Sequence, residues 1–251
     1  MPDQPPHLSV VVPTYNNAEL LPASLGALKA FCDPLPFRWE LVIIDDCSPD
    51  PRVATLLRDF AAGEPRVTLL RNELNRGKGF SVARGCLSAR GTYRVFTDVD
   101  LAYPPSEIGV VLRELEKGAD VAIACRVHRN STYIMNVGFF HYLYTRHIMS
   151  RVFNLIVRML LLRDVLDTQA GLKGFTARAA ETIFPRLTIN RFGFDVECLF
   201  IAQRHNLRIV QTPITFRYDS EPSTMHFVRD ALSMIRDLAR IRLRGFRGRY
   251  D

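Results

Sequence analysis

The sequence predicts an α/β fold in which a mostly parallel sheet is flanked by helices. Apolar, β-branched segments alternate along the first half of the chain with segments of helical spacing. Because consecutive parallel strands need a crossover connection, this alternation is typical of right-handed βαβ units. Acidic and polar residues also recur directly after the predicted strands, where open α/β sheets bind their ligands.

The predicted elements follow one another in a regular order. Each strand is an apolar run bounded by turn or polar residues, and the strands are expected at 8–16, 39–46, 66–72, 92–100 and 120–126. The intervening segments have helical spacing: helices are expected at 18–31, 53–62 and 105–117, and a loop that enters a helix at 77–89. The half beyond residue 127 is expected to contain amphipathic helices. We expect one domain over 1–224 and a basic tail over 225–251.

Composition and charge narrow the class of protein. The chain has 251 residues, of which 47% are hydrophobic and 24% charged, as in ordinary globular proteins. Five scattered cysteines without a CxxC pair indicate reduced thiols in a cytosolic protein. We expect neither a secretory signal nor a membrane span, because no basic-then-apolar leader and no run of about 18 apolar residues occur. The net charge of +7 favours anionic partners, such as a nucleotide, a lipid phosphate, a membrane surface or nucleic acid.

Two aspartates, Asp98 and Asp100, lie at the end of the fourth predicted strand and precede a turn at 103–105. Alternation along a strand would send both side chains to the same side of the sheet. Two carboxylates this close repel each other unless they are solvated, paired or bound to a cation. A hard divalent cation would remove the repulsion and take phosphate oxygens as further ligands. The pattern favours a metal site, and two solvated acids at a turn are the alternative.

A second polar segment, 71–79, places Gly77 and Gly79 on either side of Lys78 at the start of a predicted helix. Backbone N–H groups at such a position can hold an anion, with added charge from Lys78 and Arg76. The segment does not match the P-loop pattern, and no GxGxxG follows the first strand. Neither an ATPase nor a dinucleotide site is therefore indicated, and a plain basic turn is the alternative.

Several short motifs occur in order along the chain, namely VVPTYN, IIDDCSPD, RNELNRGKGFSVARG, TDVDLAYPP, DTQAGLKGF and GFDVE. Together they resemble the family 2 glycosyltransferases, which have the Rossmann-like GT-A fold. The resemblance covers about residues 8–200. It is greatest to the transferases that place a hexose on a polyprenyl phosphate, the dolichyl-phosphate glucosyltransferase and mannose synthase group. Each motif is weak alone, whereas their common order is specific.

On the donor side, the resemblance implies a nucleotide-sugar site. Asp98 and Asp100 would hold Mg²⁺ or Mn²⁺ against the diphosphate, and Asp45 or Asp46 would accept a hydrogen bond from the base. The other residues of the nucleotide pocket would be Pro13, Tyr15, Asn16, Lys78 and Gly79.

On the acceptor side, the resemblance implies a site for a lipid phosphate. Arg126, Arg146 and Ser150 match positions that hold this phosphate, and Arg151 is a near neighbour. The guanidinium fork suits phosphate oxygens, and a phosphate acceptor is already an anion that needs no strong base. The family product is β-linked, which implies an inverting single displacement. Asp195 would shape the sugar pocket or assist as a base, with structural support of a helix as the alternative.

The expected function is transfer of a hexose, glucose from UDP-glucose, to a polyprenyl or dolichyl phosphate. Mannose synthases often carry a polar metal ligand where this chain has Ala102, and the last two motifs lean toward the glucosyl branch. A soluble transferase acting on a saccharide or a small phosphorylated acceptor stays open, as does GDP-mannose as donor. Nucleic-acid binding is the remaining alternative, but no known signature for it appears, and we expect no nucleic-acid partner.

The C-terminal stretch 225–249 has the pattern of a basic amphipathic helix. Its apolar residues on one face are Val228, Leu232, Ile235, Leu238 and Ala239, and its arginines, largely on another face, are Arg229, Arg236, Arg240, Arg244 and Arg247. Such a helix is typical of membrane-surface binding, worth about 1 kcal/mol per cation near anionic lipid. Docking on the domain or formation of a homodimer are alternatives. We expect a peripheral enzyme on the cytoplasmic face of a membrane.

Overall fold

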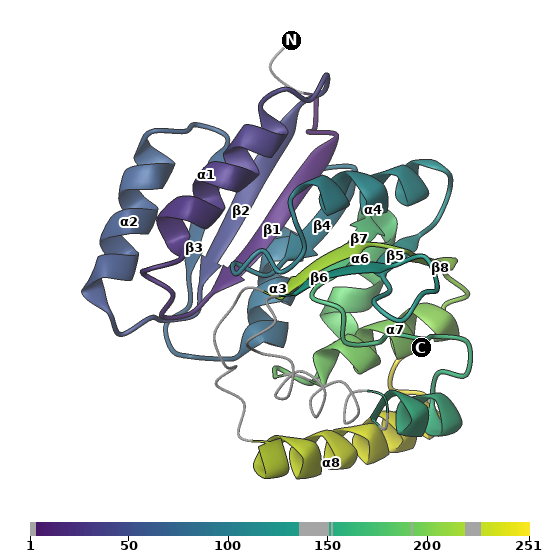
Figure 1. The fold of residues 1–251 in the computed structure, drawn as a ribbon. Helices are drawn as coiled ribbons and strands as arrows, with labels where there is room; N and C mark the ends of the chain where they lie inside the picture. The colour runs from purple at the N-terminus through teal and green to yellow at the C-terminus, as the bar shows by residue number, and fades with distance from the viewer. Residues whose placement is uncertain (1–3, 136–150, 152, 192, 219–226) are drawn as a thin grey trace.

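The computed structural model describes residues 4–135, 151, 153–191, 193–218 and 227–251. It shows an α/β arrangement of a large sheet with helices on both faces (Figure 1). In chain order its elements are β1 (Leu8–Thr14), α1 (Leu21–Cys32), β2 (Trp39–Asp45), α2 (Pro51–Ala62), β3 (Val67–Arg71), α3 (Lys78–Ser88), β4 (Tyr93–Thr97), α4 (Ser106–Glu116), β5 (Val121–Ala124), β6 (Thr132–Met135), β7 (Leu172–Thr176), α6 (Ala177–Ile183), η2 (Phe184–Arg186), α7 (Phe194–Arg204), β8 (Ile209–Thr212), β9 (Thr215–Tyr218) and α8 (Phe227–Phe246).

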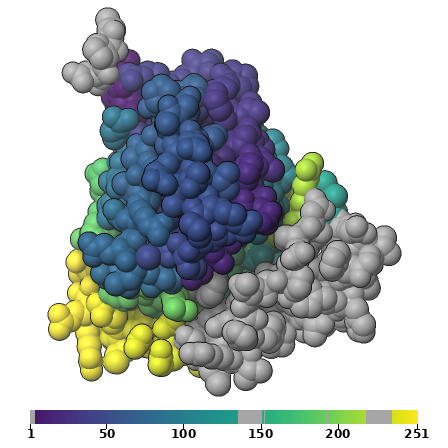
Figure 2. Space-filling view, turned by 90° about the vertical axis from the view of Figure 1, so that its left-hand side faces the viewer, coloured from purple at the N-terminus to yellow at the C-terminus, as the bar shows by residue number. Residues whose placement is uncertain are grey.

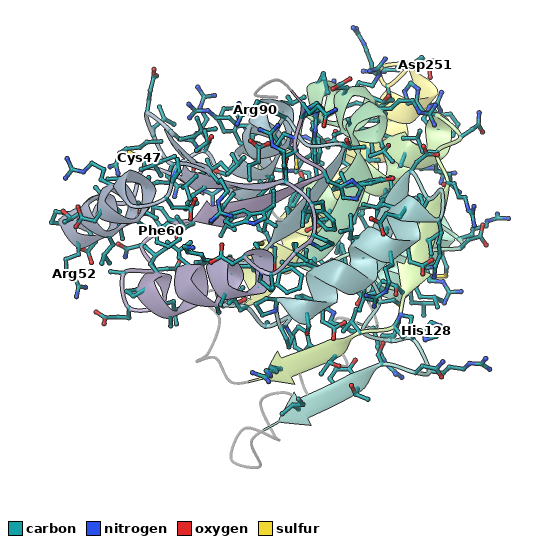
Figure 3. The ribbon with its side chains drawn as sticks, turned by 90° about the horizontal axis from the view of Figure 1, so that it is seen from above. Cys47, Arg52, Phe60, Arg90, His128 and Asp251 are labelled. Carbon is teal, nitrogen blue, oxygen red and sulfur yellow. The ribbon has the colours of Figure 1, made fainter. Side chains whose placement is uncertain are left out.

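The large sheet has the strand order β3-β2-β1-β4-β7-β5-β8. All neighbouring pairs are parallel except those of β7, which is antiparallel to both β4 and β5. The predicted mostly parallel sheet is therefore confirmed. A separate pair, β6 and β9, is also parallel and lies beside the large sheet (Figure 3).

Strand β1 shows why the central strands are apolar throughout. Its side chains alternate between the two faces of the sheet, and both faces are covered. Val10 and Val12 join a core with residues of α1, α2 and α4, whereas Val11 joins the core on the other face with residues of α3, α6 and α7. A strand that is buried on both sides cannot carry the polar alternation of a half-exposed strand.

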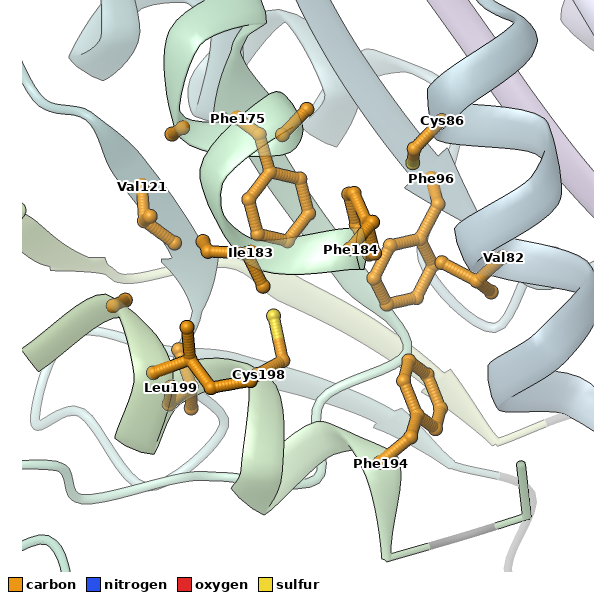
Figure 4. Packing of buried hydrophobic residues seen from close by; sticks show 14 of the residues in the cluster. Val82, Cys86, Phe96, Val121, Phe175, Ile183, Phe184, Phe194, Cys198 and Leu199 are labelled. Atoms are coloured by element: carbon orange, nitrogen blue, oxygen red, sulfur yellow. The ribbon is translucent and has the colours of Figure 1, made fainter. Parts of the chain in front are cut away.

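Four phenylalanines dominate the core on the α3, α6 and α7 side (Figure 4). The ring centroids of Phe96 and Phe194 lie 6.0 Å apart, and those of Phe175 and Phe184 lie 5.0 Å apart. Phe194 is the first residue of α7, so this packing fixes the beginning of that helix directly behind β4.

The fourth strand ends earlier than predicted, before it reaches Asp98 and Asp100. Strand β4 stops at Thr97, where β7 begins with Leu172 as its pairing partner. Asp98 to Asp100 instead form a turn, in which the N–H of Leu101 donates to the carbonyl of Asp98 at 3.2 Å. Strand alternation therefore does not apply to these two aspartates.

Helix α8 packs on the domain with one face. Leu238 and Ile241 are buried in the same core as α7, and the Tyr250 hydroxyl donates to Glu197 at 2.6 Å. In a side view the C-terminal residues lie below the N-terminal half (Figure 2). Within the ranges that the structure describes, no helix combines the length and apolar character needed to cross a bilayer. The five cysteines are free thiols, as predicted.

Candidate active site

Several of the polar side chains predicted to form the site lie at one edge of the large sheet, among the residues that the structure describes. The strands β1 to β4 are mutually parallel. Strand β5 runs in the same direction, because β7 is antiparallel to both β4 and β5. The carboxyl ends of all five strands therefore lie at this edge. At this edge the hydroxyls of Thr14 and Thr97 are buried without a hydrogen-bond partner among the described residues. Because buried hydroxyls are normally bonded, these two indicate an edge arranged for more than packing.

Asp98 lies at the centre of this edge. Its Oδ1 accepts from the ammonium of Lys78 at 2.6 Å, and its side chain is 30% exposed. Its Oδ2 lies against Gly171, where an added Cβ would collide with the carboxylate. The segment before β7 therefore needs a glycine at 171 to let the Asp98 side chain lie against its backbone. Asp100 is exposed, and its Oδ1 accepts from the N–H of Ala102 at 3.1 Å.

Lys78 is the cation of this cluster. Burial works against its charge, but Asp98, Asp195 and Asp100 outweigh burial and raise the pKa of Lys78. All three carboxylates therefore act on one ammonium group. Asp98 and Asp100 lie in a turn rather than in a strand, and their joint binding of a metal ion stays a prediction.

Asp195 is held from behind by a second lysine. Lys173 of β7 is completely buried, and its ammonium donates to Oδ1 of Asp195 and to the carbonyl of Ala170. Burial raises the pKa of Asp195, and Lys173 and Lys78 limit the rise. Both ammonium groups also face the ring of Phe96, at 5.4 Å for Lys173 and 5.9 Å for Lys78. Acids and lysines thus alternate across the site as Asp98, Lys78, Asp195 and Lys173.

Asp45 and Asp46, the predicted partners of the base, are both buried. Oδ1 of Asp45 accepts from the N–H of Ser48 at 2.9 Å, and Oδ2 accepts from the guanidinium of Arg71. Asp46 accepts from the side chain of Asn72 at 2.6 Å and also binds two backbone N–H groups of the following loop. Both carboxylates thus organise the protein at this edge, and contact with a base stays a prediction.

The loop before α3 differs from the predicted anion cradle. The N–H groups of Arg76 and Gly77 donate to Asp46, at 2.9 and 2.7 Å, so they face a carboxylate of the protein. Gly77 has φ +100°, a conformation that favours glycine. A Cβ on Gly79 would lie 2.6 Å from the Cβ of Phe194. The two glycines therefore bring Lys78 close to α7, and Lys78 is left as the cation of the loop that reaches the site.

Residues after β1 form the rim of the edge. Pro13 belongs to β1 and pairs with Ile44, and Tyr15 is 45% exposed. Asn16 has φ +58°, and its N–H donates to the hydroxyl of Ser48 at 2.8 Å. These contacts tie the end of β1 to the end of β2, and the role of Pro13, Tyr15 and Asn16 in nucleotide binding stays a prediction.

Arg126 lies beyond β5 and forms a forked ion pair with Asp167. Its Nε and Nη2 both lie 2.8 Å from the carboxylate oxygens, and its backbone N–H also donates to Asp167. Burial opposes the charge of Asp167, but Arg126 more than compensates and lowers its pKa. The carboxylate fixes the orientation of the guanidinium, whose ζ carbon lies 5.8 Å from the ring centre of Phe216.

Arg151 is exposed, and its role in acceptor binding stays a prediction. Burial raises the pKa of Tyr133, and Arg126 and Arg151 both oppose the rise, so both guanidinium groups act on this hydroxyl. The hydroxyl itself donates to the carbonyl of Arg126 at 2.7 Å. The other two predicted acceptor residues, Arg146 and Ser150, lie outside the described residues.

Two residues of the site were missed by the sequence reasoning, although both belong to the DTQAGLKGF motif. Asp167 orients Arg126, and Lys173 orients Asp195. Each pair joins residues far apart in sequence, and sequence spacing therefore gave no sign of the pairing. An acid and a lysine inside an otherwise apolar segment were the available signal, because buried charges are normally paired.

The residues present fit a divalent cation that brings its own phosphate ligands. The ammonium of Lys78 already occupies a cation position 2.6 Å from Asp98, within reach of the charge of Asp100. No group of three or more acidic, histidine or cysteine side chains suited to a metal occurs among the described residues. Two carboxylates match an ion that takes only a few protein ligands and retains water or phosphate oxygens, as Mg²⁺ does.

Comparison with known families agrees with this arrangement. Residues 9–184 match the family model described as "Glycosyl transferase family 2". The chain belongs to this family. The glycosyltransferase identity predicted from the motifs is thereby confirmed, and Asp98 and Asp100, Lys78 and Asp45 all lie within the matched range.

Three curated relatives of this glycosyltransferase are named dolichyl-phosphate beta-glucosyltransferase. This chain is 34% identical to the one from Dictyostelium discoideum, over 95% of this chain and 74% of the relative. It is 30% identical to the protein of that name from Saccharomyces cerevisiae, over 99% of this chain and 78% of the relative. It is 31% identical to the human protein of that name, over 97% of this chain and 77% of the relative.

Solved structures confirm the fold of this glycosyltransferase. A mannosyltransferase from Pyrobaculum calidifontis, crystallised with GDP-Man and Mn²⁺, has a TM-score of 0.62 at 18% identity, over 95% of this chain and 65% of that one. A glucosyl-3-phosphoglycerate synthase from Mycobacterium tuberculosis, crystallised with Mn²⁺, UDP and its product, has a TM-score of 0.60 at 18% identity, over 94% and 80%. Likeness at this level of identity establishes the GT-A architecture.

Proposed function

We propose that this glycosyltransferase moves glucose from UDP-glucose to dolichyl phosphate or a similar polyprenyl phosphate, with inversion at the anomeric carbon. The observation that carries the proposal is the name shared by relatives that are 30% or more identical over almost the whole chain. The site supports it, because acids suited to a metal diphosphate lie at the same sheet edge as a carboxylate-oriented arginine.

On the donor side, Asp98 and Asp100 would hold Mg²⁺ or Mn²⁺. A divalent cation bound there would neutralise the negative charge that develops on the leaving diphosphate. Lys78 adds a second positive charge at the same place, and Lys173 keeps Asp195 in a fixed position beside it. The charged side chains of the protein thus line the proposed position of the diphosphate.

On the acceptor side, Arg126 and Arg151 would orient the lipid phosphate, together with Arg146 and Ser150 from outside the described residues. An oxygen of the phosphate forms the new bond to the anomeric carbon, while the bond from that carbon to the UDP oxygen breaks. The attacking oxygen is already ionised, so no base has to remove a proton. Asp195 faces two lysines at the other side of the site, which favours a structural and sugar-shaping role over that of a base.

We further propose that the enzyme binds a membrane surface, on the cytoplasmic face, through segment 225–251 and the helical stretch 153–160. Arg242 of α8 donates to the carbonyl of Leu160, which places the two helices in contact. Large apolar side chains remain exposed on them, namely Leu155, Met159, Leu160, Ile235, Leu243 and Phe246. Apolar side chains among arginines suit an interface with anionic lipid, since each arginine adds about 1 kcal/mol near such a surface.

A product assay tests the proposal. The purified enzyme is incubated with Mg²⁺ or Mn²⁺, a panel of nucleotide sugars, and either dolichyl phosphate or 3-phosphoglycerate, and products are identified by mass. We expect a hexosyl lipid from UDP-glucose and dolichyl phosphate. The matched control is Arg113→Ala, a surface arginine of α4 remote from the site edge, which should leave the product unchanged. A product only with the small phosphorylated acceptor, or only with GDP-mannose, contradicts the proposal.

A further inference from the structure

Lys78 occupies the position at which the proposed metal site would have to take up its cation. The ammonium lies 2.6 Å from Oδ1 of Asp98, a distance at which a carboxylate and an ammonium are in direct contact. A divalent ion that used this oxygen would have to remove the ammonium from it. The charge of Asp98 is therefore neutralised by a residue of the protein itself.

An ammonium displaced from Asp98 has few other carboxylates to bind. Its Cα is fixed, because α3 begins at Lys78 and the adjoining Gly79 is pressed against Phe194. Of the two other acids that act on it, Asp100 would bind the same metal ion, and Asp195 already accepts from the buried ammonium of Lys173. Bringing Lys78 onto Asp195 as well would place two ammonium groups on one buried carboxylate, which is unfavourable because they repel each other.

We propose that Lys78 couples metal binding to nucleotide binding: its ammonium pairs with Asp98 when no metal ion is bound there, and it moves to the diphosphate when metal and nucleotide bind together. The inference rests on the proposed donor site and adds a positioning residue to it. A metal ion alone must displace the ammonium without offering it a new anion. A metal ion that arrives with a diphosphate supplies both the replacement cation for Asp98 and the anion that receives Lys78.

The coupling has a measurable signature that does not depend on turnover. Mn²⁺ binding is followed by the electron paramagnetic resonance signal of the free ion, with and without UDP, and in a parallel series with GDP. For the native protein we expect weak binding of Mn²⁺ alone and a marked gain when the nucleotide is present. The ratio of the two affinities is the coupling factor, and such factors are typically about 5- to 150-fold.

The decisive variant is Lys78→Met, which keeps the length of the side chain and removes its charge. We expect it to bind Mn²⁺ alone about tenfold more tightly than the native protein and to lose most of the gain from UDP. Lys78→Arg keeps the positive charge and should retain part of the coupling. Asp98→Asn should bind Mn²⁺ poorly under both conditions, which verifies that the ion uses this carboxylate. Circular dichroism and thermal melting confirm that each variant is folded.

The outcomes separate this inference from the proposed function. An unchanged coupling factor in folded Lys78→Met overturns the inference, even if both affinities shift together, because Lys78 would then be a structural ion pair. A Lys78→Met protein that binds Mn²⁺ alone no better than the native protein also overturns it. If the native protein binds no Mn²⁺ with either nucleotide, the metal site itself fails. Transfer to a different acceptor would refute the proposed function and leave the coupling intact.

Discussion

Two pairs of aspartates at the same sheet edge, Asp45 with Asp46 and Asp98 with Asp100, look alike in sequence but have different surroundings. The first pair is 1% and 4% exposed and accepts hydrogen bonds from backbone, amide and guanidinium groups of the protein. In the second pair, Asp98 meets a flexible lysine side chain and Asp100 is exposed. A carboxylate bound to several fixed donors belongs to the scaffold, whereas one bound to an ammonium can exchange it for a ligand.

The largest effect is expected for Asp98, in the rate of transfer. Asp98→Asn removes the charge that would hold the metal, and we expect transfer to fall by at least about a hundredfold. The melting temperature should change little, because Asp98 is partly exposed and lies in a turn. Product formation and thermal melting are measured on the same preparation. Undiminished transfer by Asp98→Asn in the presence of a chelator would refute the metal role of this carboxylate.

The opposite result is expected for a scaffold aspartate. Asp46→Ala leaves the side chain of Asn72 and the N–H groups of Arg76 and Gly77 without their acceptor, and we expect unfolding free energy to fall by about 3 kcal/mol. Denaturant titration measures the loss. Asp59→Ala, at an exposed position of α2, is the matched control and should change stability by less than about 0.5 kcal/mol. Equal stabilities for the two variants would erase the distinction between the aspartate pairs.

Acid titration extends the comparison to Asp167. Because its folded-state pKa is lowered, its ionised form stabilises the fold above its ordinary pKa, and this contribution is lost as pH falls through the lowered value. The native protein should therefore exceed Asp167→Asn in unfolding free energy at pH 7. The difference should narrow once the pH falls below the ordinary value of about 3.9 for aspartate. Urea titrations at several pH values follow it, and a gap independent of pH would point to packing instead of charge.

The smallest effect is expected at the proposed membrane surface. Replacing Leu155, Met159 and Phe246 together by serine should weaken sedimentation with anionic vesicles by about tenfold, since each is more than half exposed and loses apolar contact with lipid. Leu20→Ser, at an exposed position before α1, is the control. Deleting 225–251 is a poor test, because Leu238, Ile241 and Tyr250 are buried and their loss would damage the domain. Unchanged sedimentation of the triple variant would contradict a role for this surface.

The sequence predicted the parallel part of the sheet well because its strands are buried on both faces and are therefore uniformly apolar. Strand β7 was not predicted. Its segment LKGFT carries a lysine and a glycine, and the lysine is tolerated only because Asp195, distant in sequence, neutralises it. The early end of β4 was also not predicted, since it depends on where β7 begins. Both differences arise from pairings between distant segments, which local patterns do not contain.

The site shows the same limit. The acids Asp98 and Asp100 and the basic residue Lys78 could be selected from sequence, because charged residues beside apolar strands are conspicuous. Their mutual contact could not, and neither could the orientation of Arg126 by Asp167. Single residues are visible in a sequence, whereas the charge that each one faces is a property of the folded chain.

The small sheet of β6 and β9 has a mechanical consequence for the donor edge. The N–H of Arg217 in β9 donates to the carbonyl of Ala102 at 2.7 Å, and the rings of Tyr103 and Phe216 lie 4.9 Å apart. The turn that carries both aspartates is thus bound to β9, which pairs with β6, and β6 holds Tyr133 beside Arg126. A shift of this turn would therefore also move the segment that lies beside Arg126.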